Sequence, residues 1–402
     1  MTKKEDVLQI RVVPQIADIP AAVWDTCANP SQPETERSRT SGFPYNPFVS
    51  HSFLSSLEES GSATAKTGWM PQHLVAETPD GRARGVVPCY LKAHSLGEYV
   101  FDRGWAEAYA RAGGEYYPKL QVSVPFTPAT GRRLLVVPGD DEDAVRAGLL
   151  QGLTELCALR EASSAHITFM PEAECALAAA HGFLQRTDQQ FHWCNAGHGS
   201  FEDFLAALTS RKRKLIKRER RDAVANGIEI KWLTGSDLTE SVWDAFFEFY
   251  METGSRKWGR PYLTRKFYSL IGERMADKVL LVMAQRAGRY VAGAINFIGS
   301  DTLFGRHWGA TEHHPFLHFE VCYYQAIEFA IAHRLARVEA GAQGEHKLAR
   351  GYLPQTTYSA HYIADAGFRR AVADYLARER AYVRAAGEEL EEMSPFRRDA
   401  SA

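Results

Sequence analysis

The order of sequence features in the first half of this 402-residue chain recurs in its second half, on either side of a basic stretch. Each half has a short helix pattern with aromatic residues, a hairpin pattern with glycine at its turn, the motif aromatic-x-Arg-x-Trp-small, and a longer helix pattern. These features lie at 46–60, 73–91, 101–106 and 145–159, and again at 261–275, 279–298, 304–309 and 318–335. The recurrence predicts a duplicated domain, with halves at 1–199 and 200–402.

The basic stretch between the halves runs from Ser200 to Gly227. Ser200 can cap a helix with Asp203 at its third position, and Asn226-Gly227 is a typical helix end. A single helix over residues 200–227 is therefore predicted, docked by a thin apolar seam.

The charge of this predicted helix suggests what it binds. Residues 211–221 include eight basic side chains and one acidic one, although the whole chain has a net charge of −2. We expect these cations to face a polyanion, such as a phosphorylated carrier. A solvated charged helix is the alternative. The candidate binding residues are Arg213, Lys217 and Arg221.

The composition is that of an ordinary globular protein of two domains. No run of about 18 apolar residues occurs, and the charged N-terminus does not resemble a signal peptide, so we expect a cytoplasmic protein without a membrane span. The six cysteines form no CxxC pair, which argues against a zinc ribbon or a disulfide framework. Residues 29–47, rich in proline and serine, are expected to form a loop. The oligomeric state stays open.

Several longer strings are characteristic of one family. They are WAEAYARAGGEYYPKL at 105–120, PFTPATGRRLL at 125–135, the string from FHWCNAG to RKRKLIKRERR at 191–221, RHWGATEHHPFLHFEVCYYQAIEFAI at 306–331 and EAGAQGEHKLARGYLPQTTYSAHY at 339–362. On these strings the chain resembles, from about residue 45 to 376, the FemAB-like branch of the GNAT superfamily, often labelled peptidoglycan biosynthesis or recognition proteins. The resemblance implies an α+β fold of tandem GNAT-like (acyl-CoA N-acyltransferase-like) domains, each a mixed, largely antiparallel sheet flanked by helices.

The two halves are expected to differ in role. An acetyl-CoA site normally has an Arg/Gln-x-x-Gly-x-Gly/Ala loop before a helix, which holds the pyrophosphate. The corresponding segment of the first half, PGDDEDAV at 138–145, is acidic, and that of the second half, GATEHHPFLHFE at 309–320, lacks the glycine pattern. We therefore expect the first half to be degenerate or acceptor-binding. The second half is expected to have the basic helix, the active site and a C-terminal amphipathic helix.

Two groups of residues in the second half are candidates for catalysis. Glu320 and Tyr324 lie four residues apart on a predicted helix, so they are expected to point together as base and proton donor. Their alternative roles are a favourable charge at the helix N-terminus and a packed core residue. The second group is a glycine-flanked cluster of ionisable residues, for which a surface loop is the alternative. It consists of Glu345, His346, Lys347 and Arg350. Lys347 falls near the place where Fem-type enzymes keep a basic residue for the acyl carbonyl or the carrier phosphate, so the resemblance implies this role for Lys347.

Further binding residues are predicted from aromatic and basic positions. Arg306 and Trp308, with their counterparts Arg103 and Trp105, are expected to line two grooves, although tryptophan in a strand is more often a core residue. Tyr117 and Lys119 precede a proline-rich segment and are expected to form a substrate wall. The spacing of four histidines fits no standard metal site, so no metal is expected. These histidines are His307, His313, His314 and His318.

The predicted function is transfer of an acyl or aminoacyl group to an amine acceptor, and cell-wall synthesis is the candidate process. The co-substrate would be acyl-CoA or aminoacyl-tRNA, that is, a phosphorylated acyl carrier of the thioester or tRNA kind. The alternative is a non-catalytic module that presents the basic helix to RNA or to an anionic glycan carrier.

Overall fold

The chain forms two compact units. The structure, a computed structural model, describes residues 8–30, 43–258, 261–341 and 344–397, so most of the loop expected at 29–47 lies outside the described residues. The first unit comprises residues 1–188 and 356–383, and the second comprises residues 189–355 and 384–402. The division at residue 199 into two GNAT-like halves stays a prediction.

The first unit contains two groups of strands. Strands β1 (Gln9–Val13), β3 (His73–Glu77), β4 (Ala83–Val87) and β7 (Leu135–Val136) form an antiparallel sheet in that order. The second group has the order β15-β8-β6-β5-β2, in which β6 and β8 run parallel and the other neighbours whose pairing is described run antiparallel. Its members are β2 (Trp69–Pro71), β5 (Cys89–Lys92), β6 (Lys119–Val122), β8 (Ser164–Met170) and β15 (Leu353–Ile363).

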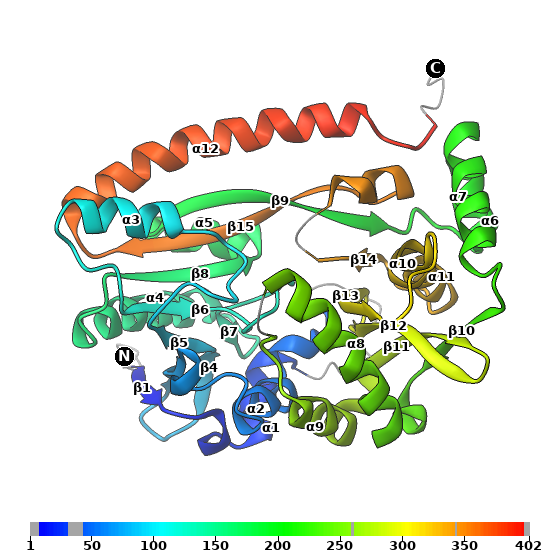
Figure 1. The fold of residues 1–402 in the computed structure, drawn as a ribbon. Coiled ribbons are helices and arrows are strands. Elements are labelled where there is room, and N and C mark those ends of the chain that lie inside the picture. The colour runs from blue at the N-terminus through cyan, green and yellow to red at the C-terminus, as the bar shows by residue number, and fades with distance from the viewer. Residues whose placement is uncertain (1–7, 31–42, 259–260, 342–343, 398–402) are drawn as a thin grey trace. The chain divides into compact units, whose positions relative to one another are not determined.

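Helices surround these strands (Figure 1). They are α1 (Ala21–Ala28), α2 (His51–Glu59), α3 (Arg103–Arg111), α4 (Glu142–Leu159) and α5 (Glu172–Ala180), and α12 (Ala366–Glu392) begins in this unit. Helix α4 buries Leu149 and Leu153 against strand residues such as Leu74 and Ile167, which makes one apolar core. Helix α2 is capped by Ser50, whose hydroxyl accepts a hydrogen bond from the Phe53 amide at 3.2 Å.

The second unit is built on a sheet of the order β10-β11-β12-β13-β14-β9. Strands β10 (Ile228–Leu233), β11 (Val279–Arg286), β12 (Arg289–Ile298) and β13 (Thr302–Ala310) are antiparallel neighbours. Strand β14 (Arg337–Glu339) runs parallel to β13 and antiparallel to β9 (Leu184–Cys194). The predicted hairpin at 279–298 is confirmed, and its turn places Gly288 at φ 76°.

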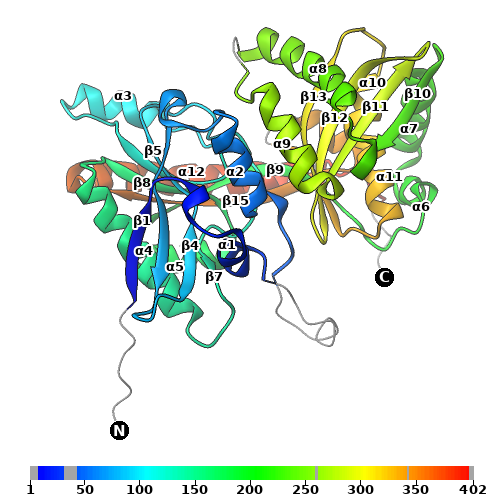
Figure 2. The ribbon, with the colours of Figure 1, turned by 90° about the horizontal axis from the view of Figure 1, so that it is seen from below.

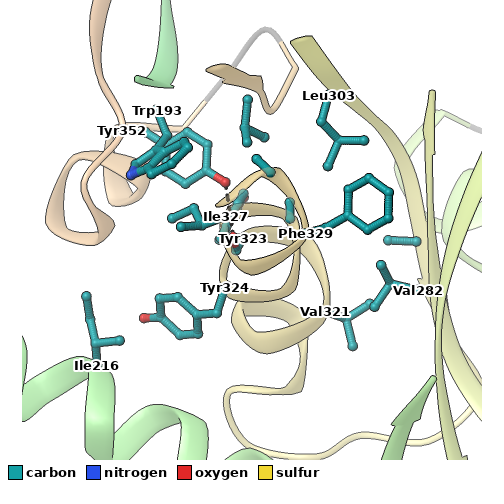
Figure 3. Close-up of a cluster of buried hydrophobic side chains, with 14 of the residues drawn as sticks. Trp193, Ile216, Val282, Leu303, Val321, Tyr323, Tyr324, Ile327, Phe329 and Tyr352 are labelled. Atoms are coloured by element: carbon teal, nitrogen blue, oxygen red, sulfur yellow. Dashed lines mark hydrogen bonds between the residues drawn. The ribbon is translucent and has the colours of Figure 1, made fainter. Parts of the chain in front are cut away.

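Helices cover both faces of this second sheet (Figure 2). Helices α8 (Glu240–Trp258) and α9 (Arg265–Met275) cover one face. The other face is covered by α10 (Leu317–Phe319), a π-helix (Glu320–Tyr324) and α11 (Gln325–Ala332), which follow one another directly and are called the 317–332 helix below. Figure 3 shows the core that this helix makes, in which Val321 faces Val282 of the sheet and Tyr324 extends toward Ile216.

The basic stretch is two helices, so the prediction of one helix over 200–227 was wrong. Helix α6 (Phe201–Ala207) begins at the predicted Ser200 cap, and α7 (Ser210–Ala223) contains the basic residues. Between them Leu208 is extended and forms a β-bridge with Phe396. The Thr209 amide donates to the Pro395 carbonyl at 3.0 Å, and the Arg397 amide donates to the Ala207 carbonyl at 3.0 Å. The C-terminal segment thus satisfies the backbone groups that the break exposes.

The predicted repeat is present only in part. The helix-then-hairpin order occurs in both units, as α2 with β3–β4 and α9 with β11–β12. The motif match was wrong, because Arg103 and Trp105 lie in helix α3 whereas Arg306 and Trp308 lie in strand β13. Alanines at 106, 108 and 110 favour a helix in the first copy. The two tryptophans are therefore not equivalent positions. In the described part of the chain no helix is long and apolar enough to cross a membrane.

Candidate active site

A pocket lies at the point where two parallel strands of the second unit diverge. Strands β13 and β14 pair at residues 302–304 and 337–339, and β13 continues past this register to Ala310. The pocket, of about 150 Å³, lies along this continuation. Strand β12 is bulged opposite it, between Ala294 and Asn296. The lining comes from β12, β13, α8, the 317–332 helix and the residue that follows β14: Tyr250, Thr253, Gly254, Ala294, Asn296, Gly305, Arg306, His307, Trp308, His318, Cys322, Tyr323 and Ala340.

Rings form much of the pocket wall. His307 packs against Tyr250 at 4.9 Å between ring centroids, and Trp308 packs against His318 at 5.2 Å. Burial, with a smaller effect of Arg306, lowers the pKa of His307 well below its ordinary value. His307 is therefore neutral at neutral pH. The predicted groove residues Arg306 and Trp308 both line this pocket.

Tyr323 connects the pocket to an exposed histidine. Its side chain lines the pocket, the residue is 5% exposed, and burial raises its pKa. Its hydroxyl is hydrogen-bonded to Nε2 of His346 at 2.9 Å, and His346 is exposed. A proton could thus pass between the pocket and solvent through one hydrogen bond.

Lys347 lies directly behind one wall of the pocket. It is 2% exposed, and its Nζ donates to the carbonyl of Gly341 at 2.9 Å, next to the lining residue Ala340. Burial, aided by the charge of Arg306, lowers the pKa of Lys347 to about 8, and Cys322 opposes this in part. Lys347 therefore remains mainly cationic at neutral pH.

The predicted cluster around Lys347 is a short 3-10 helix, Glu345–Arg350. The structure brings His346 to the pocket residue Tyr323, and Arg350 to the helix residue Phe319. The side chain of Glu345 lies outside what the structure describes. The catalytic and binding roles assigned to these four residues stay predictions.

Glu320 and Tyr324 do not point together, so the predicted base–donor geometry was wrong. Glu320 is 2% exposed and accepts hydrogen bonds from Nε and Nη2 of Arg220 at 3.0 and 2.9 Å. Tyr324 instead donates to Glu219, an acidic residue of α7. Neither side chain belongs to the pocket lining.

The π-helix explains this difference. In an α-helix, residues four apart share a face, whereas a π-helix bonds residue i to residue i+5. Accordingly the Gln325 amide donates to the Glu320 carbonyl, and Nε2 of Gln325 donates to the Glu320 carboxylate at 2.7 Å. The wider turn also brings Cys322 and Tyr323, rather than Tyr324, to the pocket.

The residues of α7 divide between its two faces. Lys217 pairs with Glu202 at 2.8 Å and Arg221 pairs with Asp222 at 2.8 Å, and both cations are exposed. Arg213 is half-buried. The buried face includes Ile216, Glu219 and Ala223. Carrier binding by the exposed cations stays a prediction.

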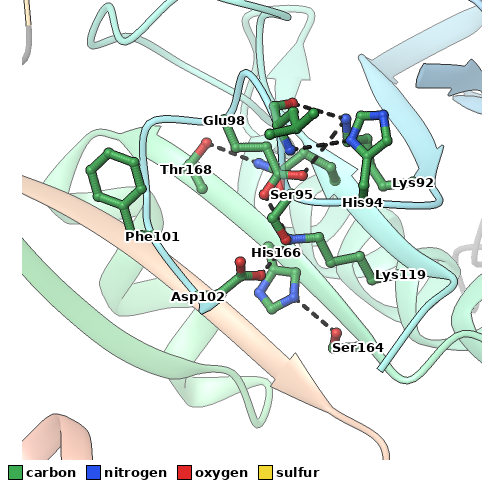
Figure 4. A network of polar contacts seen from close by, with 12 residues as sticks. Lys92, His94, Ser95, Glu98, Phe101, Asp102, Lys119, Ser164, His166 and Thr168 are labelled. Carbon is green, nitrogen blue, oxygen red and sulfur yellow. Dashed lines mark hydrogen bonds and ion pairs between the residues drawn. The ribbon is translucent and has the colours of Figure 1, made fainter. Parts of the chain in front are cut away.

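In the first unit, Lys119, which was predicted to form a substrate wall, and Trp105, which was predicted to line a groove, are both buried. Lys119 is fully buried and is bound by Glu98 at 2.6 Å and by Asp102, in the network of Figure 4. Burial alone would lower the pKa of Lys119, but these two carboxylates raise it. Trp105 is 7% exposed and contacts the ring of His361 at 5.0 Å. Lys119 and Trp105 therefore do not form a surface groove.

The other two predicted residues of this unit lie around the same network. The Tyr117 hydroxyl is bonded to the Ser95 hydroxyl at 2.8 Å, beside the segment that contains Glu98. Arg103 is exposed at the start of α3. Their predicted roles in substrate binding stay predictions.

The sequence patterns did not indicate a role at this site for three residues, Glu219, Arg220 and Tyr323. Glu219 is the only acidic residue between 211 and 221. Its isolation in a basic run could have indicated a buried pairing role. Nothing in the sequence distinguishes Tyr323 from Tyr324, because the choice between them depends on the π-helix.

The histidines near the pocket have partners other than a metal. His314 Nε2 is bonded to Glu312 at 2.8 Å, and His307 and His318 pack against rings. Over the residues that the structure describes, no three His, Cys, Asp or Glu side chains are placed to hold a metal ion.

The fold and the pocket define a protein of the tandem GNAT-like class, with an α+β fold. The chain belongs to the FemAB-like family, described as peptidoglycan biosynthesis/recognition, whose model matches residues 15–398. Among solved structures it is similar to FemX, with 12% identity, a TM-score of 0.52, and coverage of 83% of this chain and 96% of that one.

Two further structures are similar at lower scores. L-PGS from Bacillus licheniformis has 10% identity, a TM-score of 0.49, and coverage of 84% of this chain and 99% of that one. A tandem GNAT protein from the clavulanic acid biosynthesis pathway has 13% identity, a TM-score of 0.44, and coverage of 89% and 99%. No curated protein matches the sequence.

Proposed function

We propose that the chain is an N-acyltransferase or aminoacyltransferase whose active site is the pocket of the second unit. The observation that carries the proposal is the pocket between parting strands, with the cationic Lys347 behind one wall and Tyr323 in another. Such a pocket with a few polar groups is the usual form of a small-ligand site. The described family and the tandem GNAT-like fold support group transfer to an amine.

Lys347, Tyr323 and His346 would each contribute to one step of aminolysis. The amine nitrogen attacks the acyl carbon, a C–N bond forms, and negative charge develops on the carbonyl oxygen. The Lys347 cation would stabilise this charge or a carrier phosphate. The bond to the carrier sulfur or oxygen then breaks, and the leaving atom takes the proton of the Tyr323 hydroxyl. The amine gives up one proton to solvent, and Tyr323 regains one through His346, so the proton count balances.

The donor would be a phosphorylated acyl carrier, either acyl-CoA or aminoacyl-tRNA. The exposed cations of α7 support this, because they offer several charges to phosphate groups. The family description supports an acceptor amine in cell-wall synthesis. The cytoplasmic location expected from the sequence stays a prediction.

The first unit would be degenerate or would bind the acceptor. In the second unit, β13 precedes the 317–332 helix and β14 follows it. These two strands pair in parallel and then diverge at the pocket. In the first unit the strands on either side of α4 are β7 and β8, which belong to different groups, and β6 takes the place beside β8. Strand β6 would thus fill the position that corresponds to the pocket of the second unit.

The alternative is a non-catalytic module that binds RNA or an anionic glycan carrier through α7. The exposed basic face favours it. Turnover decides between the two functions, because a binding module needs the cations of α7 but not Tyr323 or Lys347.

The test offers the purified protein a panel of acyl-CoA thioesters and aminoacyl-tRNAs, with amine acceptors that include peptidoglycan precursor peptides. Mass spectrometry then detects the new amide. We expect product with the native chain, and a strong loss with Tyr323→Phe or Lys347→Met. Tyr382→Phe, which alters an exposed tyrosine on α12, is the matched control. RNA binding without product from any donor would favour the alternative.

A further inference from the structure

Helix α7 has two charged residues on its inner side in addition to the cations of its outer face. Glu219 and Arg220 are adjacent on this inner side, at 3% exposure for Glu219 and half-burial for Arg220. Such buried charges are rare unless they are paired. Both are paired, Glu219 with Arg350 and Tyr324, and Arg220 with Glu320 and Glu328.

Glu219 is connected to the Lys347 segment. Its Oε1 accepts from Nη2 of Arg350 at 2.8 Å, and Nη1 of Arg350 donates to the backbone carbonyl of His346 at 2.7 Å. The Arg350 guanidinium also lies 3.4 Å from the ring centroid of Phe319. Arg350 is 6% exposed, so its position is fixed from several sides. Glu219 therefore restrains the residue directly before Lys347.

Arg220 is connected to the wall that the π-helix forms. It binds Glu320 at 2.9 Å and Glu328 at 2.6 Å, and its guanidinium lies 4.3 Å from the ring centroid of Phe201. Gln325 donates to Glu320 at 2.7 Å and accepts from Nε1 of Trp232 at 2.7 Å. These bonds hold both ends of the π-helix.

That π-helix supplies two lining residues, Cys322 and Tyr323. A π-helix is less favourable than an α-helix and occurs mostly as a single turn at functional sites. Fixed partners at Glu320 and Gln325 keep its wider turn in place. The hydroxyl of Tyr323 is thereby kept within reach of His346.

We propose that Glu219 and Arg220 are positioning residues that hold the Lys347 segment and the π-helix in the geometry the pocket needs. This inference rests on the proposed function for its catalytic meaning, but its structural content stands apart from it. Helix α7 would then have two functions. Its outer cations would bind the carrier, and its inner charged residues would position the active site. Sites held by fixed supporting groups are the more precise ones.

The test measures how well Lys347 is held, without any assay of turnover. A small amine-reactive reagent labels the native protein at several pH values, and peptide mass spectrometry gives the labelling rate of Lys347. In Glu219→Gln the bond to Arg350 loses its charge. Because only the neutral amine reacts, the rates are compared at the high-pH plateau, where we expect Lys347 to label at least about tenfold faster. Its pH midpoint should move from about 8 toward 10.5, because water reaches the amine.

The matched control is Glu202→Gln, which removes an exposed ion pair between α6 and Lys217 of α7, also at 2.8 Å. We expect it to label as the native chain does. Equal labelling of Lys347 in Glu219→Gln and in the control would overturn the proposal. Should Glu219→Gln fail to fold, Arg350→Lys provides the same measurement, because a lysine cannot bind both Glu219 and the His346 carbonyl as the guanidinium does.

Kinetics separate this inference from the proposed function. If turnover is found, Glu219→Gln and Arg220→Lys should lower kcat with little change in the KM of the donor, whereas Lys217→Glu should raise that KM. A chain that shows no turnover but still shows the labelling change would refute the proposed function and leave the positioning role in place.

Discussion

Replacing Lys347 by methionine should change the pH dependence of stability in a calculable way. The pKa of Lys347 is about 8 in the folded chain, compared with an ordinary value of 10.5. The unfolded chain therefore binds the proton more tightly than the folded chain does. Between pH 8 and 10.5 the unfolded state binds more protons, so the free energy of unfolding rises with pH in this window.

The magnitude follows from these two pKa values. A difference of one pKa unit corresponds to about 1.4 kcal/mol, so the buried cation costs about 3 kcal/mol at pH 7, where both states are protonated. At pH 9.5 the same cost falls to about 1.4 kcal/mol, because the folded amine is neutral while most unfolded amines are still charged. The native chain should thus gain about 2 kcal/mol relative to Lys347→Met between pH 7 and 9.5.

The assay is urea unfolding of both proteins at pH 7, 8, 8.75 and 9.5, with the difference in unfolding free energy plotted against pH. Subtraction removes the groups that titrate alike in the two proteins. Lys214→Met, which removes an exposed lysine of α7, is the control and should give a flat difference. A flat difference for Lys347→Met as well would refute the reasoning, since Lys347 would then titrate alike in the folded and unfolded chains.

Three further predictions concern Tyr323, Glu320 and Lys217. Tyr323→Phe should lower kcat by about 10²–10⁴-fold, because the proposed proton donor is lost. The melting temperature should change little, because the only bond lost is that of the hydroxyl to an exposed histidine. Unchanged turnover would rule out the role of Tyr323 as proton donor. Glu320→Gln should lower the free energy of unfolding by about 2–4 kcal/mol in urea, because it weakens the support of a partly buried Arg220; unaltered stability would show that this pair contributes little. Lys217→Glu should weaken binding of single-stranded RNA and flatten its salt dependence by about one charge or more; an unchanged slope in a binding titration would place the polyanion elsewhere.

Much of the fold followed from local features of the sequence. The caps at Ser50 and Ser200, the hairpin at 279–298 and the helix at 142–159 depend on residues close in the chain, and all are present. The break in the basic helix could not be predicted this way. It depends on backbone groups of Pro395 and Arg397, which lie almost two hundred residues further along.

The candidate site was predictable to a smaller extent. The pattern of charges indicated the Lys347 cluster, and the motif at 304–309 indicated Arg306 and Trp308, which line the pocket. The error at Glu320 and Tyr324 came from assuming a regular helix. The missed role of Glu219 arose because the partner that buries it, Arg350, lies in a distant 3-10 helix.

The first unit is completed by a segment from near the end of the chain, and this has a consequence for synthesis. Strand β8 pairs with residues 358–363 of β15, and its His166 meets His361, which lies 195 positions later. At roughly 5–20 residues per second, the ribosome needs about 10–40 s to supply that partner. During this interval one side of β8 has no native neighbour, so the nascent chain must be protected from wrong pairing. Expressing residues 1–199 alone would make this exposure permanent, and we expect that fragment to aggregate while the full chain remains in solution.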